Sequence, residues 1–171
     1  LLSSSASAHQ GLQDQIDAVN RRLIETPGNP DALQHRGFLL RSQGDTRRAL
    51  VDYDALINMA PKRADYRLER AKTLVLAGLP GKAFQDLDWI IEQQQLLDRA
   101  YDERARLYEV QGNLEKARAD YVQAICFVQD QSFYLRYAGV LDRLKLTERA
   151  TAVVSEGLKH YPHSYELTQA W

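Results

Sequence analysis

The sequence repeats itself every 34 residues, and this period constrains the possible folds more than any local pattern. Four columns of similar residues share the step. The columns hold Gly44, Gly78 and Gly112; Gly37, Ala71 and Ala105; Ala49, Ala83 and Ala117; and Tyr53, Leu87 and Tyr121. A fourth copy follows after 33 residues, with Ala138, Ala150 and Val154 in three columns and Lys145 in place of the glycine. Such columns indicate one supersecondary unit used several times.

Each copy is predicted to be a pair of helices. In the first copy, Leu33, Gly37 and Leu40 share one face of a helix expected over residues 31–42. Gly44 then breaks the pattern, because glycine readily takes the left-handed conformation that ends a helix.

The second helix of the first copy is expected from Thr46 to Ala60. Asp45 can cap its first turn, and Pro61 denies the next turn an N–H group. Small residues in fixed columns allow the two helices of a pair to approach closely, and the large residues fill the space between neighbouring pairs. One pair cannot bury its apolar face alone, so we expect the pairs to stack.

These columns resemble the tetratricopeptide repeat family. The first copy carries the pattern at Leu33, Gly37, Leu40, Ala49, Tyr53 and Pro61, and the third carries it at Tyr101, Ala105, Tyr108, Ala117, Tyr121 and Ala124. The resemblance implies an all-α fold, a right-handed superhelical solenoid of stacked antiparallel helix pairs, with about four repeats plus flanking helices. The expected segments are a disordered tail or a signal or anchor remnant at 1–8, an N-terminal helix at 9–29, repeats at 30–63, 64–97, 98–130 and 131–164, and the start of a capping helix at 165–171.

Some positions depart from the family pattern. Arginines stand where the family has a leucine before the small residue, the closing proline is replaced twice, and one turn glycine is missing. The departures are Arg36, Arg70 and Arg104; Gln95 and Gln129; and Lys145. We expect altered local geometry, above all between the second and third copies.

The resemblance also implies a concave groove, lined by the first helices, that binds a peptide or helix of a partner protein. The candidate groove residues are His35, Phe38, Arg41, Leu68, Lys72, Arg99, Arg106, Arg136 and Arg143. Phe38 and Leu68 are the favoured contacts, because an exposed apolar side chain in a groove gains from burial. The charged pairs Glu69 with Lys72 and Glu103 with Arg106 are expected to neutralise each other. Phe38 and Lys72 stand where carboxylate-binding relatives carry asparagine, which argues against capture of a C-terminal carboxylate.

Other classes of function find little support. The net charge is −1, so a polyanion such as nucleic acid is not an expected partner. The single cysteine, Cys126, lies in an apolar run and is predicted to be a buried, inert thiol. No apolar stretch is long enough to insert in a bilayer. No residue pattern indicates catalysis, a metal site or a cofactor, so a non-catalytic scaffold is the preferred interpretation.

Three alternatives remain open. The repeats can be a docking, regulatory or oligomerisation module of a larger exported or membrane-anchored protein, or of an enzyme. Leu158, Leu167 and Trp171 are apolar at the last repeat, which allows a homodimer there. Residues 1–8 end in a small-x-small pattern typical of a signal-peptidase site, which favours a periplasmic or secreted protein over a cytoplasmic one.

Overall fold

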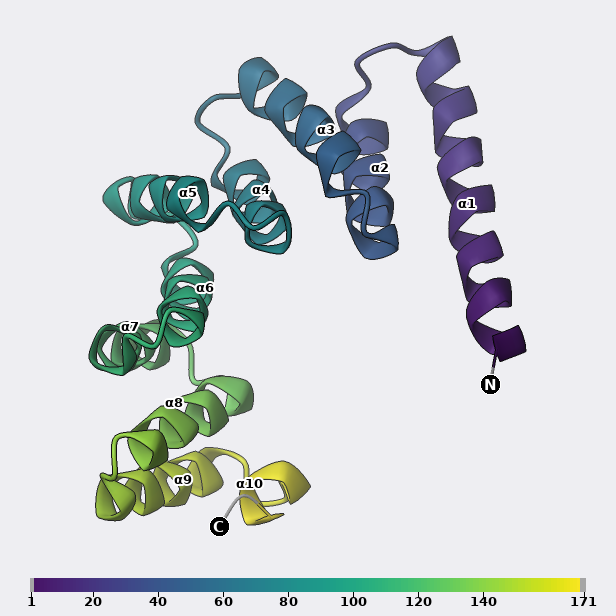
Figure 1. Cartoon of the computed structure of the whole chain (residues 1–171). Coiled ribbons are helices and arrows are strands. Elements are labelled where there is room, and N and C mark those ends of the chain that lie inside the picture. Colours follow the sequence, from purple (N-terminus) through teal and green to yellow (C-terminus); the bar gives the residue numbers. More distant parts are fainter. Residues whose placement is uncertain (1, 170–171) are drawn as a thin grey trace. The chain divides into compact units, whose positions relative to one another are not determined.

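The computed structural model describes the backbone of residues 2–169 and the side chains of residues 10–169, and in this part of the chain every regular element is a helix (Figure 1). The helices are α1 (Leu2–Glu25), α2 (Pro30–Gln43), α3 (Thr46–Met59), α4 (Ala64–Leu76), α5 (Pro80–Glu92), α6 (Leu97–Val110), α7 (Leu114–Phe127), α8 (Gln131–Arg143), α9 (Thr147–His160) and α10 (Tyr165–Gln169). Sequential helices pack in pairs, such as α2 with α3, α6 with α7 and α8 with α9. The predicted all-α class is confirmed.

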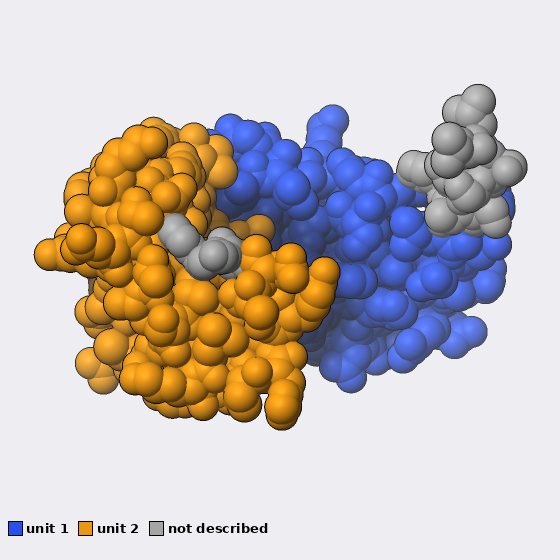
Figure 2. All heavy atoms as spheres, turned by 90° about the horizontal axis from the view of Figure 1, so that it is seen from below, with its two compact units in different colours: residues 1–86 blue, residues 87–171 orange. Residues whose placement is uncertain are grey.

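The chain forms two compact units, residues 1–86 and residues 87–171, which Figure 2 colours separately. In the first unit, α1, α2 and α3 enclose a core that includes Ile16, Leu40, Tyr53 and Leu56. In the second unit, one cluster joins α6, α7 and α8 around Tyr121 and Val140, and another joins α8, α9 and α10.

The repeat columns are the packing positions. The alanines of the second helices, Ala49, Ala83, Ala117 and Ala150, are all fully buried. The large residues Tyr53, Leu87 and Tyr121 are also fully buried, as predicted. Close approach is evident at Gly37, where an added Cβ would lie 3.0 Å from Cζ of Tyr53.

Polar caps start several helices, including the one predicted at Asp45. The side chain of Asp45 accepts a hydrogen bond from the backbone N–H of Arg48, and that of Asn113 accepts one from Lys116. Ser164 caps α10 by accepting a hydrogen bond from the N–H of Leu167. Each cap pairs an N–H group that the first helical turn leaves without an intrahelical partner.

Left-handed residues end the first helix of each repeat. Gly44, Gly78 and Gly112 have φ values of 91°, 73° and 75°. Lys145 adopts the same conformation with φ 63°, although it carries a Cβ. The turn is therefore a property of the repeat, and it is kept where glycine is absent.

The connection between α5 and α6 differs from the others. Two non-glycine residues, Gln94 and Leu96, have positive φ values of 53° and 44°. They flank Gln95, which stands in place of the closing proline. The expected change of local geometry between the second and third copies is observed here.

The N-terminal helix is longer than the sequence pattern specifies, whereas α10 begins at the expected residue, Tyr165. Helix α1 begins at Leu2, whereas a helix was expected only from residue 9. The side chains of residues 1–9 lie outside the described part of the structure. The signal or anchor remnant expected at residues 1–8 falls within this stretch. Trp171 is also outside the described residues. Leu167 is buried and packs in the same cluster as Leu158, so neither forms an open apolar surface.

Candidate ligand-binding site

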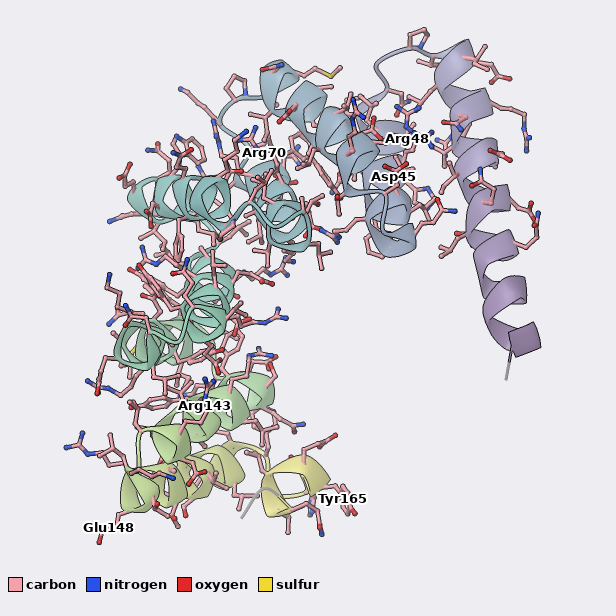
Figure 3. All side chains as sticks on the ribbon, in the orientation of Figure 1. Asp45, Arg48, Arg70, Arg143, Glu148 and Tyr165 are labelled. Atoms are coloured by element: carbon pink, nitrogen blue, oxygen red, sulfur yellow. The ribbon has the colours of Figure 1, made fainter. Side chains whose placement is uncertain are left out.

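In the first three repeats, an arginine ties the first helix to its neighbours. Each donates two hydrogen bonds to a buried aspartate located 16 residues later. The three pairs are Arg36 with Asp52, Arg70 with Asp86, and Arg104 with Asp120. The same guanidinium groups also contact the residues 16 positions earlier, Asn20, Asp54 and Asp88. Arg70, labelled in Figure 3, thus links α4 both to α3 and to the middle of α5.

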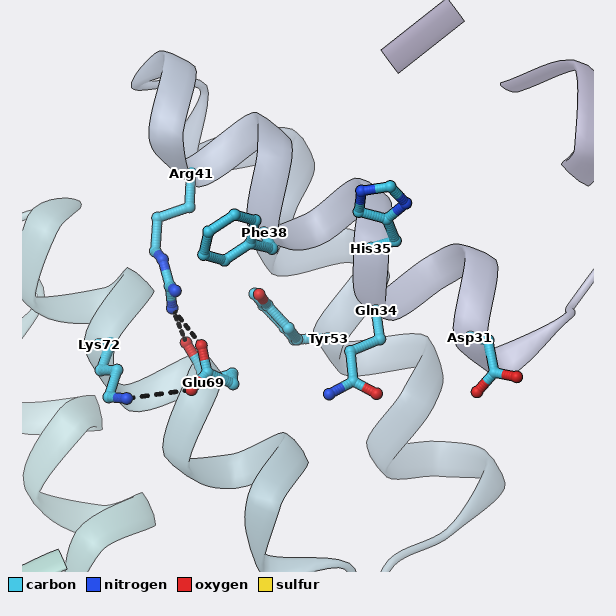
Figure 4. A pocket seen from close by; sticks show the side chains of 8 residues that line it. All are labelled: Asp31, Gln34, His35, Phe38, Arg41, Tyr53, Glu69 and Lys72. Atoms are coloured by element: carbon cyan, nitrogen blue, oxygen red, sulfur yellow. Dashed lines mark hydrogen bonds and ion pairs between the residues drawn. The ribbon is translucent and has the colours of Figure 1, made fainter. Parts of the chain in front are cut away.

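A pocket of about 510 Å³ lies on the first unit, between α2, α3 and α4. Its lining residues are Asp31, Gln34, His35, Phe38, Arg41, Tyr53, Glu69 and Lys72 (Figure 4). Four of the predicted groove residues, His35, Phe38, Arg41 and Lys72, therefore lie together. The arginine network orients α2 relative to α3 and thereby positions the side chains that α2 presents to this pocket.

Glu69 organises the charged end of the pocket. Its carboxylate contacts Nη1 of Arg41 at 2.7 Å and Nζ of Lys72 at 3.0 Å. Arg41 also donates to the backbone carbonyl of Glu69 at 3.2 Å. Burial raises the pKa of Glu69, but the two cations outweigh burial and hold that pKa below its usual value. The pair predicted from sequence is therefore part of a partly buried cluster and not an isolated solvated pair.

Phe38 provides the apolar surface of the pocket. Its side chain is 50% exposed, and the guanidinium of Arg41 lies 5.5 Å from the ring centroid. An exposed aromatic ring beside a cation is a surface on which an apolar group of a ligand can pack.

The expectation that Leu68 is an exposed groove contact is wrong, because its side chain is only 1% exposed. Leu68 shares a helical face with Ala64 and Ala71, which are buried as well. This face of α4 packs into the interior, and the pocket receives the neighbouring Glu69 and Lys72 instead.

Tyr53 lines the pocket, and Figure 4 shows its hydroxyl end pointing toward the ring of Phe38. The hydroxyl is buried and has no hydrogen-bond partner among the described residues. Burial raises the pKa of Tyr53 to about 12, so the group carries its proton and is a potential donor.

A second pocket, of about 300 Å³, lies on the second unit and gathers Arg106, Arg136 and Arg143 with Glu109 and Val110. Each arginine has an acidic partner: Arg143 contacts Glu109 at 2.8 Å, and the other two contact Glu103 and Asp102. Arg143 is labelled in Figure 3. Three more predicted groove residues are thus brought together, with their charges compensated. Arg99 is exposed on α6 and lines neither of these two pockets.

Cys126 is exposed near the end of α7, so the prediction of a buried thiol is wrong. Its helix turns Ala124 inward, and Cys126 therefore falls on the outer side together with Phe127.

Among the described residues, no cluster of three His, Cys, Asp or Glu side chains could hold a metal ion. Within the same residues, none of the helices combines the length and the apolar character needed to cross a membrane.

Two features escaped prediction from sequence. The aspartates Asp52, Asp86 and Asp120 stand 34 residues apart, as do the three arginines that they bind, so a search for charged columns could have found these pairs. The unpartnered hydroxyl of Tyr53 had no such signal, because a repeat column predicts burial of the ring and not the partners of its oxygen.

No protein-family model matches the chain. Two curated proteins are similar in sequence. The "Tetratricopeptide repeat protein 36 homolog" of Drosophila pseudoobscura pseudoobscura is 34% identical over 97 residues, which are 54% of this chain and 52% of that protein. The "Inactive TPR repeat-containing thioredoxin TTL3" of Arabidopsis thaliana is 31% identical over 106 residues, 62% of this chain and 15% of that protein. The chain thus spans about half of one relative and a smaller part of the other.

Solved structures share the fold across nearly the whole chain. MamA (residues 41 to the end) from Desulfovibrio magneticus RS-1 superposes with a TM-score of 0.74 at 14% identity and covers 96% of this chain and 93% of its own. YrrB, described as a TPR protein with an unusual peptide-binding site, has a TM-score of 0.67 at 12% identity and covers 98% of this chain and 87% of its own. With its 34-residue columns, its paired helices and these structural neighbours, the chain has the fold of tetratricopeptide-repeat proteins.

Proposed function

We propose that this chain is a non-catalytic scaffold that binds a peptide or an extended segment of a partner protein on its first helices. The observation that carries the proposal is the pocket between α2, α3 and α4, which combines the exposed ring of Phe38 with fixed charges and a buried hydroxyl. Its volume of about 510 Å³ is within the range of about 300–1,000 Å³ typical of ligand pockets.

The fold supports the proposal. YrrB, which shares the fold, is described as having a peptide-binding site. In stacked repeats the first helices form a continuous surface suited to extended ligands.

A docking module within a longer polypeptide is the second candidate. Its support is the curated relative from Arabidopsis, of which the matched residues make up only 15%. The groove would have the same role in that setting, because binding depends on the repeats and not on what they are attached to.

The test is selection of peptides from a displayed random library on the purified chain, followed by measurement of dissociation constants by fluorescence anisotropy. A Phe38→Ala variant should weaken binding of the selected peptides about tenfold, since it removes apolar contact area. The matched control is Val51→Ala on α3, which also removes an exposed apolar side chain (64% exposed) but lies outside this pocket. Equal affinities of the parent and the Phe38→Ala variant would contradict the proposal.

A further inference from the structure

We infer that the pocket between α2, α3 and α4 is specific for an uncharged peptide amide, whose carbonyl oxygen accepts a hydrogen bond from the hydroxyl of Tyr53 while a neighbouring apolar side chain packs on Phe38. This inference rests on the proposed function and specifies its ligand. It starts from the hydroxyl of Tyr53, a buried donor without an acceptor among the described residues. Such a group lowers stability unless a ligand or water pairs with it, and therefore calls for a functional explanation.

The third repeat contains an internal comparison. Tyr121 occupies the same column as Tyr53, two repeat periods later, and its hydroxyl donates a hydrogen bond to Oε1 of Glu109. The residue that corresponds to Glu109 in the first repeat is Arg41. A guanidinium group has only donors, so Arg41 cannot accept a hydrogen bond from the hydroxyl of Tyr53. The exchange of one acidic residue for a basic one thus leaves the first repeat with a free donor at the pocket.

The charges around Tyr53 favour a neutral acceptor. The pocket is lined by two acidic residues, Asp31 and Glu69, and two basic residues, Arg41 and Lys72. Glu69 already contacts both cations, at 2.7 and 3.0 Å. A carboxylate placed at the hydroxyl would be repelled by Glu69 and would compete for its partners, whereas an amide carbonyl would not.

Access to the hydroxyl requires a small movement. The oxygen exposes less than 1 Å², so the pocket surface covers it in the unbound chain. Phe38 stands beside it, and its half-exposed ring can change rotamer on the fast timescale of surface side chains. An apolar side chain of the ligand would contact the displaced ring and keep the hydroxyl open to the neighbouring carbonyl.

The experiment uses two acetylated tripeptides with the sequence Ala-Leu-Ala, one ending in a methylamide and the other in a free carboxylate. Each is titrated into the ¹⁵N-labelled chain of residues 1–171 and followed by NMR chemical shifts. The methylamide should shift the resonances of α2 and α4 around the pocket and bind more tightly than the free acid. Tyr53→Phe, which removes only the hydroxyl, should weaken binding of the methylamide at least threefold. Tyr121→Phe is the matched control and should leave its binding unchanged.

Thermal unfolding of the same variants checks that the two hydroxyls differ. Tyr53→Phe should melt at the parent's temperature or above, since it removes a buried group without a partner, whereas Tyr121→Phe should melt lower. Equal binding by the parent and Tyr53→Phe, or tighter binding of the free acid, would overturn the inference. Those results would leave the proposed function standing as long as Phe38→Ala still weakens binding of the selected peptides. Failure of this inference can therefore be distinguished from failure of the proposed function.

Discussion

The guanidinium of Arg36 donates two parallel hydrogen bonds to the carboxylate of Asp52, from Nε at 2.9 Å and from Nη2 at 2.6 Å. Asp52 is 2% exposed, so the pair is buried on its acidic side. The hydrogen bond to Asp52 raises the pKa of Arg36, against the opposing effect of burial. Nη1 of the same arginine reaches Asn20 on α1 at 2.9 Å. One side chain therefore connects three consecutive helices.

Replacing Arg36 alone should destabilise the chain strongly. Arg36→Leu leaves the carboxylate of Asp52 buried without its cation, which typically costs about 3–5 kcal/mol. In the double variant Arg36→Leu, Asp52→Leu no buried charge remains, so most of that loss should be recovered. Urea unfolding of the parent and the three variants, including Asp52→Leu, measures the coupling. A double variant no more stable than Arg36→Leu would show that the pair matters for its geometry and not for its charge.

The close contact between Gly37 and Tyr53 should not tolerate a methyl group. In Gly37→Ala the new Cβ would lie 3.0 Å from Cζ of a fully buried ring, and we expect a loss of about 1–3 kcal/mol. Gly139→Ala in α8 is the control: its Cβ would meet nothing within 4 Å, so the better helix propensity of alanine should add about 0.5–1 kcal/mol. Thermal or urea unfolding compares the two. Similar effects of both substitutions would argue against tight packing at Gly37.

The repeat period made the fold predictable because each column carries a packing constraint that is independent of the rest of the chain. A small residue must stand where two helices meet, and Ala49 and Ala117 are fully buried as this requires. The capping residues Asp45 and Asn113 were predictable for a similar reason, since a cap depends only on the first turn of its own helix.

The site was less predictable because it depends on how helices face one another. Leu68 was expected in the groove, yet the face of α4 that carries it turns inward. Arg36 looked like a departure from the family pattern, although it has a buried partner 16 residues away on the next helix. The hydroxyl of Tyr53 lacks a partner because residue 41, on the preceding helix and outside the tyrosine column, is an arginine.

Placing a glycine at position 145, in the turn between α8 and α9, should stabilise the second unit. Lys145 has φ 63°, a conformation that costs a residue with a Cβ about 1–2 kcal/mol, and glycine adopts it without this strain. Because glycine also gains freedom in the unfolded chain, the net gain expected for Lys145→Gly is about 0.5–1 kcal/mol. Lys145→Ala keeps the strain and should give no such gain, and unfolding by urea separates the two. If alanine stabilised as much as glycine, loss of the lysine charge would be the cause.

Asp102 should make stability depend on pH. Burial raises the pKa of Asp102 from 3.8 to about 6, although Arg136 donates a hydrogen bond to it at 2.8 Å and opposes the shift, while Glu103 adds to it. The pKa of Asp102 in the folded chain lies above its value in the unfolded chain. The contribution of Asp102 to the free energy of unfolding is therefore fully present below pH 3.8 and is lost as pH rises through about 6. Asp102→Asn keeps an oxygen for Arg136 but cannot ionise. We therefore expect the variant to gain about 1–2 kcal/mol relative to the parent between about pH 4.5 and about pH 7.5 in urea unfolding. A constant difference between the two proteins across this range would mean that Asp102 stays ionised throughout and that Arg136 outweighs its burial.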